Sequence, residues 1–247
     1  MTRVSACIVT LNEERKIART IESLRCCDEV LVLDCGSTDR TCAIAEGLGA
    51  RVSKEPWRGY AVQKNRAAEC AAFDWVLSLD ADETLTEELE AEVLLLKQEG
   101  FPRDGYSMPR MAQYLGRWIR HSGWYPDRKV RLYDRRKGAW HGDFVHESVH
   151  VRGLVGELQG AIHHFTCDSL SEHLGTLDRY TSLAADELVM RGRMPGMGRL
   201  VFDPAWTFVR TYVLKQGFRD GFPGLAIAYM AALYTFLKYA KARERHV

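Results

Sequence analysis

The chain has 247 residues, of which 46% are hydrophobic and 27% are charged, and it contains only seven prolines. This length suits one large domain or one domain with a substantial appendage, and the composition excludes a disordered or low-complexity chain. The net charge of +1 is unevenly spread: residues 191–247 carry ten Lys or Arg against Asp203, Asp220 and Glu244, a balance of +7 that leaves −6 for the residues before them.

The cysteine pattern and the N-terminal segment both bear on the compartment. None of the seven cysteines forms a C-x-x-C pair, so the sequence indicates neither a disulfide framework nor a zinc ribbon, and a reducing cytosol suits it best. The N-terminal MTRVSACIVTLNEE becomes acidic before any apolar stretch of signal-peptide length is reached. We therefore expect an intracellular protein.

The first hundred residues alternate between short apolar runs and helix-forming segments. The apolar runs predict strands over 4–10, 29–34, 50–54 and 74–80. Between them, the sequence predicts a helix from about 13 to 24 capped by Asn12, a second helix capped by Asp39 and ending at Gly49, and a third over 59–71. This repeat predicts an α/β fold of the doubly wound type, with a mostly parallel sheet and helices on both faces.

Polar residues follow three of the predicted strands, at the edge where open α/β sheets bind their ligands. Thr10 and Asn12 come at the end of the first strand, Asp34 begins the loop DCGSTD after the second, and the residues DADE at 80–83 follow the fourth. We therefore expect acidic and hydroxyl side chains to gather at the carboxyl edge of the sheet.

The segment VLSLDADETL, residues 76–85, permits more than one interpretation. Asp80 and Asp82, spaced as Asp-x-Asp at a strand end, can bind Mg²⁺ or Mn²⁺, because hard cations prefer oxygen ligands and share them with substrate phosphates. The same residues could merely precede a helix that Thr84 or Thr86 caps. Their place after a nearly unbroken apolar run favours the metal site.

After residue 96 the alternation weakens. Only 129–133 and the stretch HESVHV at 146–151 are predicted as strands, whereas the leucine spacing over 169–191 indicates a helix. In the basic tail, the apolar core over 224–237 is shorter than the roughly 20 residues that a spanning helix needs. We interpret it as an interfacial or buried helix ending in cations suited to anionic headgroups, or as a core helix with a solvated basic end.

Four segments, in their order along the chain, resemble the successive signatures of glycosyltransferase family 2. They are IVTLNEE at the first strand, VLVLDCGSTDRT at the second, QKNRAAE at 63–69 and VLSLDADE at the fourth. The second half, with GWYPDRKVRLY, VHESVH and the C-terminal TFVRTYVLKQGFRDGFPGLAIAYMAALYTFLKY, is similar to bacterial lipopolysaccharide inner-core β-1,4-glucosyltransferases. The resemblance therefore spans nearly the whole chain.

The resemblance implies a GT-A fold and an inverting, metal-dependent hexosyltransferase. We expect a nucleotide-sugar-binding catalytic domain over 1–168 and a basic helical region over 169–247 that associates with a membrane surface or an acceptor. The implied reaction transfers glucose from UDP-glucose to a lipid-linked saccharide such as the lipopolysaccharide inner core. It would take place at the cytoplasmic face of the cell membrane, on an anionic surface, with no nucleic acid partner; the sequence does not indicate an oligomeric state.

The resemblance also assigns residues to the donor and to the Mg²⁺ or Mn²⁺ ion. The residues assigned to the nucleotide-sugar are Thr10, Asn12, Glu13, Asp34, Ser37, Asp39, Lys64, Asp80, Ala81 and Asp82. Among them, Asp34 would hydrogen-bond the uracil and Lys64 would approach the base or the diphosphate. Asp80 and Asp82 would hold the metal, Asp82 most directly, and His164, which matches the family histidine better than His163, would complete its ligands. The metal is required because charge grows on the diphosphate as the glycosidic bond breaks.

Inversion needs a carboxylate that removes the proton of the acceptor hydroxyl. The resemblance points to Glu147 in FVHES, with Asp143 as a nearby rival and Asp127 as a more distant one. Alternatively, Glu147 is structural and pairs with Arg131 or His146.

Residues near the middle of the chain are candidates for contacts with the acceptor or with phosphate. Arg128 and Arg131 could bind phosphates, because the guanidinium fork suits that geometry. Trp124 and Tyr125 could stack on a sugar, and they could equally be packing aromatics.

Two other functions remain open from the sequence. The segment LSLDADETL also fits the haloacid dehalogenase phosphatases, with Asp80 as nucleophile, Lys129 as their lysine and GDFVHE at 142–147 as their second metal motif. Those enzymes carry the nucleophile on the first strand of their core, however, and TLNEE and DCGSTD would have no role. The second alternative is a non-catalytic membrane-surface adaptor, which the acidic groups at the strand ends do not favour.

Overall fold

The computed structural model describes residues 1–142 and 147–245, and the chain forms two compact units. The sheet unit consists of Met1–Arg110 and Asp127–His164. The helical unit consists of Met111–Pro126 and the chain from Phe165 onward. The helical unit thus takes one short segment from the middle of the chain.

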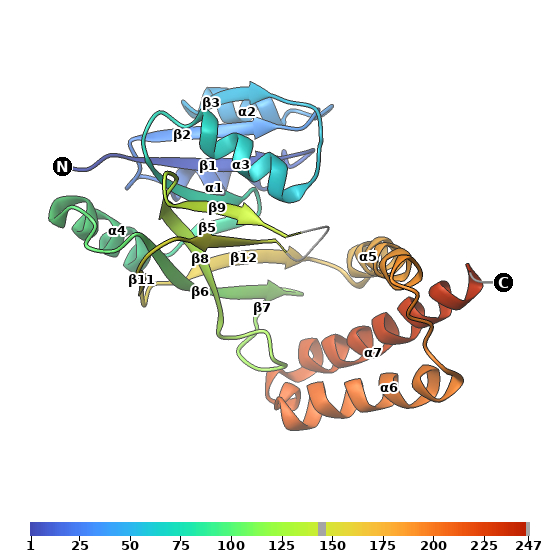
Figure 1. Cartoon of the computed structure of the whole chain (residues 1–247). Coiled ribbons are helices and arrows are strands. Elements are labelled where there is room, and N and C mark those ends of the chain that lie inside the picture. The colour runs from blue at the N-terminus through green and yellow to red at the C-terminus, as the bar shows by residue number, and fades with distance from the viewer. Residues whose placement is uncertain (143–146, 246–247) are drawn as a thin grey trace. The chain divides into compact units, whose positions relative to one another are not determined.

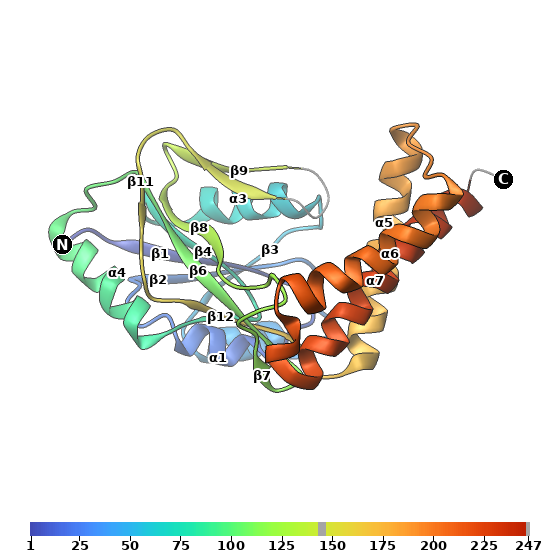
Figure 2. The ribbon, with the colours of Figure 1, turned by 90° about the horizontal axis from the view of Figure 1, so that it is seen from below.

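Parallel strands β1 to β4 build one side of the sheet in the order β3-β2-β1-β4 (Figure 1). The strands and their connecting helices are β1 (Val4–Thr10), α1 (Ile17–Glu22), β2 (Glu29–Asp34), α2 (Thr41–Gly47), β3 (Arg51–Lys54), α3 (Tyr60–Cys70) and β4 (Trp75–Asp80). Figure 2 shows α3 on one face of the sheet and α1 with α4 (Glu87–Glu99) on the other. The predicted α/β fold class, with parallel strands and helices on both faces, is confirmed.

The parallel register brings the ends of three strands to one edge. Thr10 pairs with Asp34 across β1 and β2, and Val9 pairs with Asp80 across β1 and β4. The polar residues that follow these strands therefore start from neighbouring positions, as the sequence predicted.

Beyond β4 the sheet continues as β8-β6-β12-β5 and becomes mainly antiparallel. Its further strands are β5 (Glu83–Leu85), β6 (Gly105–Tyr114), β7 (Arg117–Trp118), β8 (Asp127–Asp134), β11 (Val155–Glu157) and β12 (Ile162–Cys167), while β9 (Gly138–His141) and β10 (Ser148–Val151) form a separate pair. Both strands predicted in this half are present, inside β8 and at β10. Among the strands that were not predicted, β5, β7 and β11 have only two or three residues, too few for an alternating pattern to appear.

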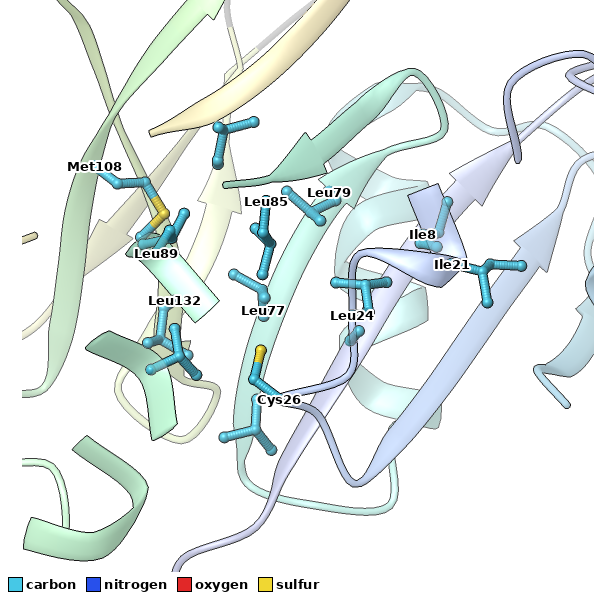
Figure 3. Packing of buried hydrophobic residues seen from close by; sticks show 14 of the residues in the cluster. Ile8, Ile21, Leu24, Cys26, Leu77, Leu79, Leu85, Leu89, Met108 and Leu132 are labelled. Atoms are coloured by element: carbon cyan, nitrogen blue, oxygen red, sulfur yellow. The ribbon is translucent and has the colours of Figure 1, made fainter. Parts of the chain in front are cut away.

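The main core fills the face of the sheet covered by α1 and α4. It joins Ile8 of β1, Leu77 and Leu79 of β4, Leu89 of α4 and Met108 of β6, all at most 1% exposed (Figure 3). A second cluster on the side of α3 contains Leu31, Leu33, Ala67 and Tyr133. The two clusters hold β1 and β4 rigidly between them, and these strands carry the residues of the site.

The structure confirms one predicted helix cap and corrects another. The Thr86 hydroxyl accepts a hydrogen bond from the Leu89 N–H (3.3 Å) at the start of α4, so a helix cap and the Asp-x-Asp pair follow each other in the chain. Asn12 does not cap a helix, because α1 begins only at Ile17, without a side-chain cap. Asn12 instead adopts a left-handed φ of 56°, which asparagine tolerates, and turns its side chain toward the loop after β2.

The helical unit is built from α5 (Leu170–Met190), α6 (Met197–Val209), a π-helical turn η1 (Arg210–Leu214), a 3₁₀ turn η2 (Gly217–Asp220) and α7 (Gly221–Glu244). The helix predicted over 169–191 is confirmed as α5, and the Ser169 hydroxyl accepts from the Glu172 N–H at its start (3.1 Å). Helix α7 packs against both α5 and α6. In the described part of the chain, every helix is too short or too polar to traverse a bilayer.

Candidate active site

The loops after β1 and β2 are tied together by side-chain to backbone hydrogen bonds. Asp34 is 1% exposed, and its carboxylate accepts from the backbone N–H groups of Gly36 and Ser37, each at 3.0 Å. The Asn12 N–H donates to the Ser37 hydroxyl (2.8 Å), and the Asn12 side-chain oxygen accepts from the Thr38 N–H (2.8 Å). The loops after β1 and β2 therefore form one continuous wall. Asp34, Asn12 and Ser37, three of the residues predicted to bind the nucleotide-sugar, hold it together.

The same wall extends to Glu13 and Asp39. The Glu13 N–H donates to the Thr41 hydroxyl (2.8 Å), and the Glu14 N–H donates to the Asp39 carboxylate (3.2 Å). Hydrogen bonds from the Thr41 hydroxyl and N–H hold the pKa of Asp39 below its usual value.

Thr10 carries an unsatisfied polar atom at the carboxyl end of β1. Its side chain is buried, and its hydroxyl has no hydrogen-bond partner within residues 1–142 and 147–245. Buried hydroxyls are normally hydrogen-bonded, so this one is suited to a ligand atom.

A cluster of ions surrounds Asp80 at the end of β4. Lys64 of α3 places its Nζ 2.8 Å from Asp80 Oδ1 and 3.2 Å from Glu147 Oε1, and Arg131 of β8 places Nη2 3.0 Å from Asp80 Oδ2. Partial burial opposes ionisation of Asp80, but Lys64 and Arg131 outweigh it and hold the pKa of Asp80 well below its usual value. The structural alternative for Glu147 named Arg131 or His146. The described partner is instead Lys64, and His146 lies outside the described residues.

Glu83 organises this cluster and was not predicted as a site residue. It is fully buried and accepts from the Asp80 N–H (3.1 Å), Arg131 Nη2 (2.9 Å) and Arg110 Nη1 (3.2 Å). Burial opposes the charge of Arg131, but Glu83 and Asp80 more than compensate and raise the pKa of that guanidinium. The only signal for Glu83 in the sequence was its place one residue after the Asp-x-Asp pair.

Asp82 and His164 meet because β12 pairs with β5. In that pairing His164 lies opposite Glu83, and its Nε2 lies 3.4 Å from Asp82 Oδ2. Lys16 Nζ lies 3.9 Å from the same oxygen. His163 points to the opposite face of the strand, where burial lowers its pKa.

The remaining candidates lie in several places. Arg128 ties the sheet together by donating to the backbone oxygens of Ser107 (3.1 Å) and Leu158 (2.7 Å). Trp124 belongs to the helical unit and packs edge-on against Tyr114, with ring centroids 5.6 Å apart.

Three more residues were predicted for the site: Ala81, Asp127 and Asp143. The Ala81 backbone oxygen accepts from the Thr20 hydroxyl (2.7 Å), which fixes the turn between Asp80 and Asp82. Asp127, the distant rival for the base, pairs with Arg110 (3.1 Å) and Lys129 (3.0 Å). Asp143, the nearer rival, lies outside the described residues.

Comparison with known proteins identifies the family to which the chain belongs. Residues 5–156 match the family described as Glycosyl transferase family 2. The chain belongs to this family. LpsC of Rhizobium meliloti (strain 1021), a lipopolysaccharide core biosynthesis glycosyltransferase, is 35% identical over 98% of this chain and 93% of its own length. An uncharacterized glycosyltransferase of Rickettsia felis is 33% identical over 99% of this chain and 90% of its own length.

Solved structures show more distant similarity. Glucosyl-3-phosphoglycerate synthase from Mycobacterium tuberculosis, in complex with Mn²⁺, UDP and glucosyl-3-phosphoglycerate, is 19% identical with a TM-score of 0.48, over 80% of this chain and 82% of that one. S. aureus TarS 1-349 in complex with UDP-GlcNAc is 14% identical with a TM-score of 0.48, over 99% of this chain and 91% of that one.

Membership of glycosyltransferase family 2 confirms the predicted enzyme class. It also makes the phosphatase interpretation of VLSLDADETL wrong, and with it the non-catalytic adaptor as the function of the chain. The predicted likeness to lipopolysaccharide core glycosyltransferases is confirmed as well.

Proposed function

We propose that this family 2 enzyme transfers a hexose, glucose in the first instance, from a UDP-sugar to a lipid-linked saccharide such as the lipopolysaccharide inner core, with inversion. The observation that carries the proposal is the position of Lys64, which joins Asp80 at the end of β4 to Glu147. The relative named for lipopolysaccharide core biosynthesis supports the acceptor class. We place the reaction at the inner face of the cell membrane, where such an acceptor would be anchored.

The nucleotide would bind against the wall formed by the loops after β1 and β2. Thr10 would donate or accept through its unsatisfied hydroxyl, and Asn12, Glu13, Ser37 and Asp39 would act through the loop conformation that they hold. A carboxylate has about four lone-pair sites, so Asp34 keeps acceptor capacity for the uracil N–H beside its two backbone donors.

The residues near Asp82 fit a divalent cation. A carboxylate oxygen and an imidazole nitrogen on partly exposed side chains are ligands that Mn²⁺ accepts, and Mg²⁺ would rely more on the oxygen. No three His, Cys, Asp or Glu side chains of the described residues form a complete metal site, so the donor diphosphate would supply the other ligands. Asp82 and His164 would hold the ion, which neutralises charge on the departing diphosphate. Because Lys64 and Arg131 occupy both oxygens of Asp80, that residue would act mainly by positioning them.

Glu147 is the best placed general base among the described carboxylates. It would take the proton of the acceptor hydroxyl as that oxygen attacks the anomeric carbon, while the bond from that carbon to UDP breaks on the opposite side. Lys64 fixes Glu147 and Asp80 on one ammonium group, so the base and the diphosphate side of the site are held by the same residue. Asp127 is a weaker candidate because two cations already engage it.

The test is a UDP-release assay on the purified protein with UDP-glucose, UDP-galactose and UDP-GlcNAc, with Mn²⁺ or Mg²⁺, and with a lipopolysaccharide acceptor truncated in its inner core. Asp82→Ala should abolish the metal-dependent release, whereas Glu46→Ala, an exposed carboxylate of α2, should leave it unchanged. Absence of UDP release from every donor in the presence of metal and acceptor would contradict the proposal, as would metal-independent release unaffected by Asp82→Ala.

A further inference from the structure

Helix α6 turns apolar side chains outward, the reverse of an ordinary surface helix. Residues 197–209 are all described, and none of them is buried. Phe202 is 73% exposed and Trp206 57% exposed. The exposed apolar side chains of α6 and η1 are Met197, Val201, Phe202, Trp206, Val209, Val213 and Leu214. Phe202, Trp206, Val209 and Val213, spaced by four, three and four residues, lie along one side of the helix.

The opposite side of α6 contacts α7 through Phe208, whose ring centroid lies 4.8 Å from that of Tyr229, and through polar groups. The Asp203 carboxylate accepts from the Tyr239 hydroxyl (3.0 Å), and the hydroxyls of Thr207 and Thr235 lie 3.4 Å apart. Figures 1 and 2 show α6 running beside α7. These contacts fix the rotation of α6 about its own axis, and this orientation keeps its exposed apolar side chains turned away from α7.

The charges around this apolar side have one sign. Among residues 192–222, all of which the structure describes, the exposed charged side chains are cations: Arg193, Arg199, Arg210, Lys215 and Arg219. The two acids in the segment are engaged elsewhere. Asp203 binds Tyr239, and the buried Asp220 accepts from the backbone N–H of His121 (3.0 Å).

A cationic cavity lies at the N-terminal end of α6. It has a volume of about 530 Å³, and its lining includes Arg193, Arg199 and Lys238 together with Tyr239 and Pro195. Burial lowers the pKa of Lys238, which an anion in the cavity would reverse.

The cations at the end of α7, in contrast, are used within the helical unit. Lys241 pairs with Asp178 (2.6 Å), Arg245 pairs with Asp186, and Arg243 donates to the Pro195 backbone oxygen (3.1 Å). The basic cluster that the sequence suggested for headgroups therefore serves to attach α7 to its neighbours. Around α6, however, Arg193, Arg199 and Arg210 are exposed and have no ion-pair partner among residues 1–142 and 147–245.

We propose that the outward side of α6 and η1 inserts into the interface of an anionic bilayer, with an anionic lipid headgroup in the cavity lined by Arg193, Arg199 and Lys238. This inference rests on the proposed membrane-anchored acceptor. It assigns to α6 and η1 the contact with the membrane that holds this acceptor. Aromatic and aliphatic side chains bordered by cations suit the headgroup boundary. A second copy of the chain fits less well, because a two-fold interface through this surface would bring cations against cations.

The test is co-sedimentation of the full chain with vesicles of phosphatidylcholine alone or with 30% phosphatidylglycerol, roughly the charge density of an anionic leaflet. The double variant Phe202→Ser/Trp206→Ser should bind the anionic vesicles about tenfold or more weakly. Arg193→Gln/Arg199→Gln should lose about tenfold on anionic vesicles and nothing on neutral ones. The control is Leu95→Ser, which removes from α4 an apolar side chain about as exposed (54%) as Trp206 (57%) and should bind as the unaltered protein does.

Each outcome either supports or overturns the proposed insertion of α6 into the bilayer interface. Unchanged vesicle binding by the serine double variant overturns the proposal, and so does a change from dimer to monomer in that variant without loss of vesicle binding. Inorganic phosphate that displaces the protein from vesicles at low millimolar concentration would mean that the cavity takes free phosphate and would overturn the headgroup assignment. Because vesicle binding is measured without donor, and UDP release is measured separately in detergent, failure of this surface and failure of the proposed reaction are distinguishable.

Discussion

Replacing Lys64 by Met removes the cation that joins Asp80 to Glu147 while keeping an unbranched side chain against the Trp140 ring. The Lys64 ammonium lies 4.3 Å from the centre of that ring and is 5% exposed. Methionine adapts well to such sites, so the change isolates the loss of charge.

The expected cost can be worked from the contacts. Removing one partner of a buried ion pair costs about 3–5 kcal/mol. Here Asp80 is 31% exposed and keeps Arg131 at 3.0 Å, so we expect the free energy of unfolding to fall by about 1–3 kcal/mol. In a domain of this size that corresponds to a Tm lower by about 3–10 °C.

The effect should depend on pH in a definite direction. Although burial opposes ionisation of Asp80, Lys64 and Arg131 lower the pKa of its carboxyl in the folded state. A lowered folded pKa contributes stability above the unfolded pKa of about 3.9, and that contribution is lost as the pH falls through the folded value. The gap between the unaltered protein and Lys64→Met should therefore be widest near neutral pH and should narrow only below about pH 4.

The measurement is urea unfolding at pH 7, 5 and 3.5, with UDP release at pH 7 on the same preparations. Because Glu147 loses its 3.2 Å partner, kcat should fall by about 10- to 100-fold. Lys54→Met, an exposed lysine of β3, is the control and should change neither quantity. A stability gap below about 0.5 kcal/mol at pH 7, together with full turnover, would refute the role given to Lys64.

Three further changes follow from the same contacts. Glu147→Gln should lower kcat by about 10²- to 10⁴-fold while calorimetric UDP binding stays the same; activity near the unaltered level would exclude Glu147 as the base. Glu83→Gln should reduce the free energy of unfolding by about 3 kcal/mol in urea, because Arg131 and Arg110 lose a fully buried counter-charge; an unaltered midpoint would show that Glu83 is dispensable. Thr86→Ala should cost about 1 kcal/mol by removing the cap of α4, which thermal unfolding would detect.

The first four strands could be predicted because their information is local. Runs such as EVLVLD at Glu29–Asp34 are almost wholly apolar, as strands buried on both faces must be, and turn residues separate them from helices.

The antiparallel half could not be predicted in the same way. In β8 (Asp127–Asp134), Arg131 is buried because Asp80 and Glu83 neutralise it, and both acids come from a distant part of the chain. The sequence predicted the strand over 129–133, but a pattern of apolar and polar residues cannot show that Arg131 is buried by partners about fifty residues away.

The residues of the candidate site likewise divide into those that local sequence marks and those that only the folded chain brings together. Asp80, Asp82 and Lys64 were found because strand ends and family motifs mark them. The contact of Asp82 with His164 was anticipated only through the resemblance, and it arises from the pairing of β12 with β5. Glu83 was missed because its role comes from three donors that only the folded chain assembles.

The interlocked loops after β1 and β2 also bear on how the donor enters. Asn12, which has a left-handed backbone conformation, is hydrogen-bonded to Ser37 and Thr38, and Glu13 is hydrogen-bonded to Thr41. Neither loop can therefore move without breaking hydrogen bonds to the other. The conformational entropy of this wall is lost when the chain folds, so nucleotide binding does not carry that cost. Recognition of the base should thus resemble docking to a rigid template, and any closing movement over the sugar would have to come from other segments.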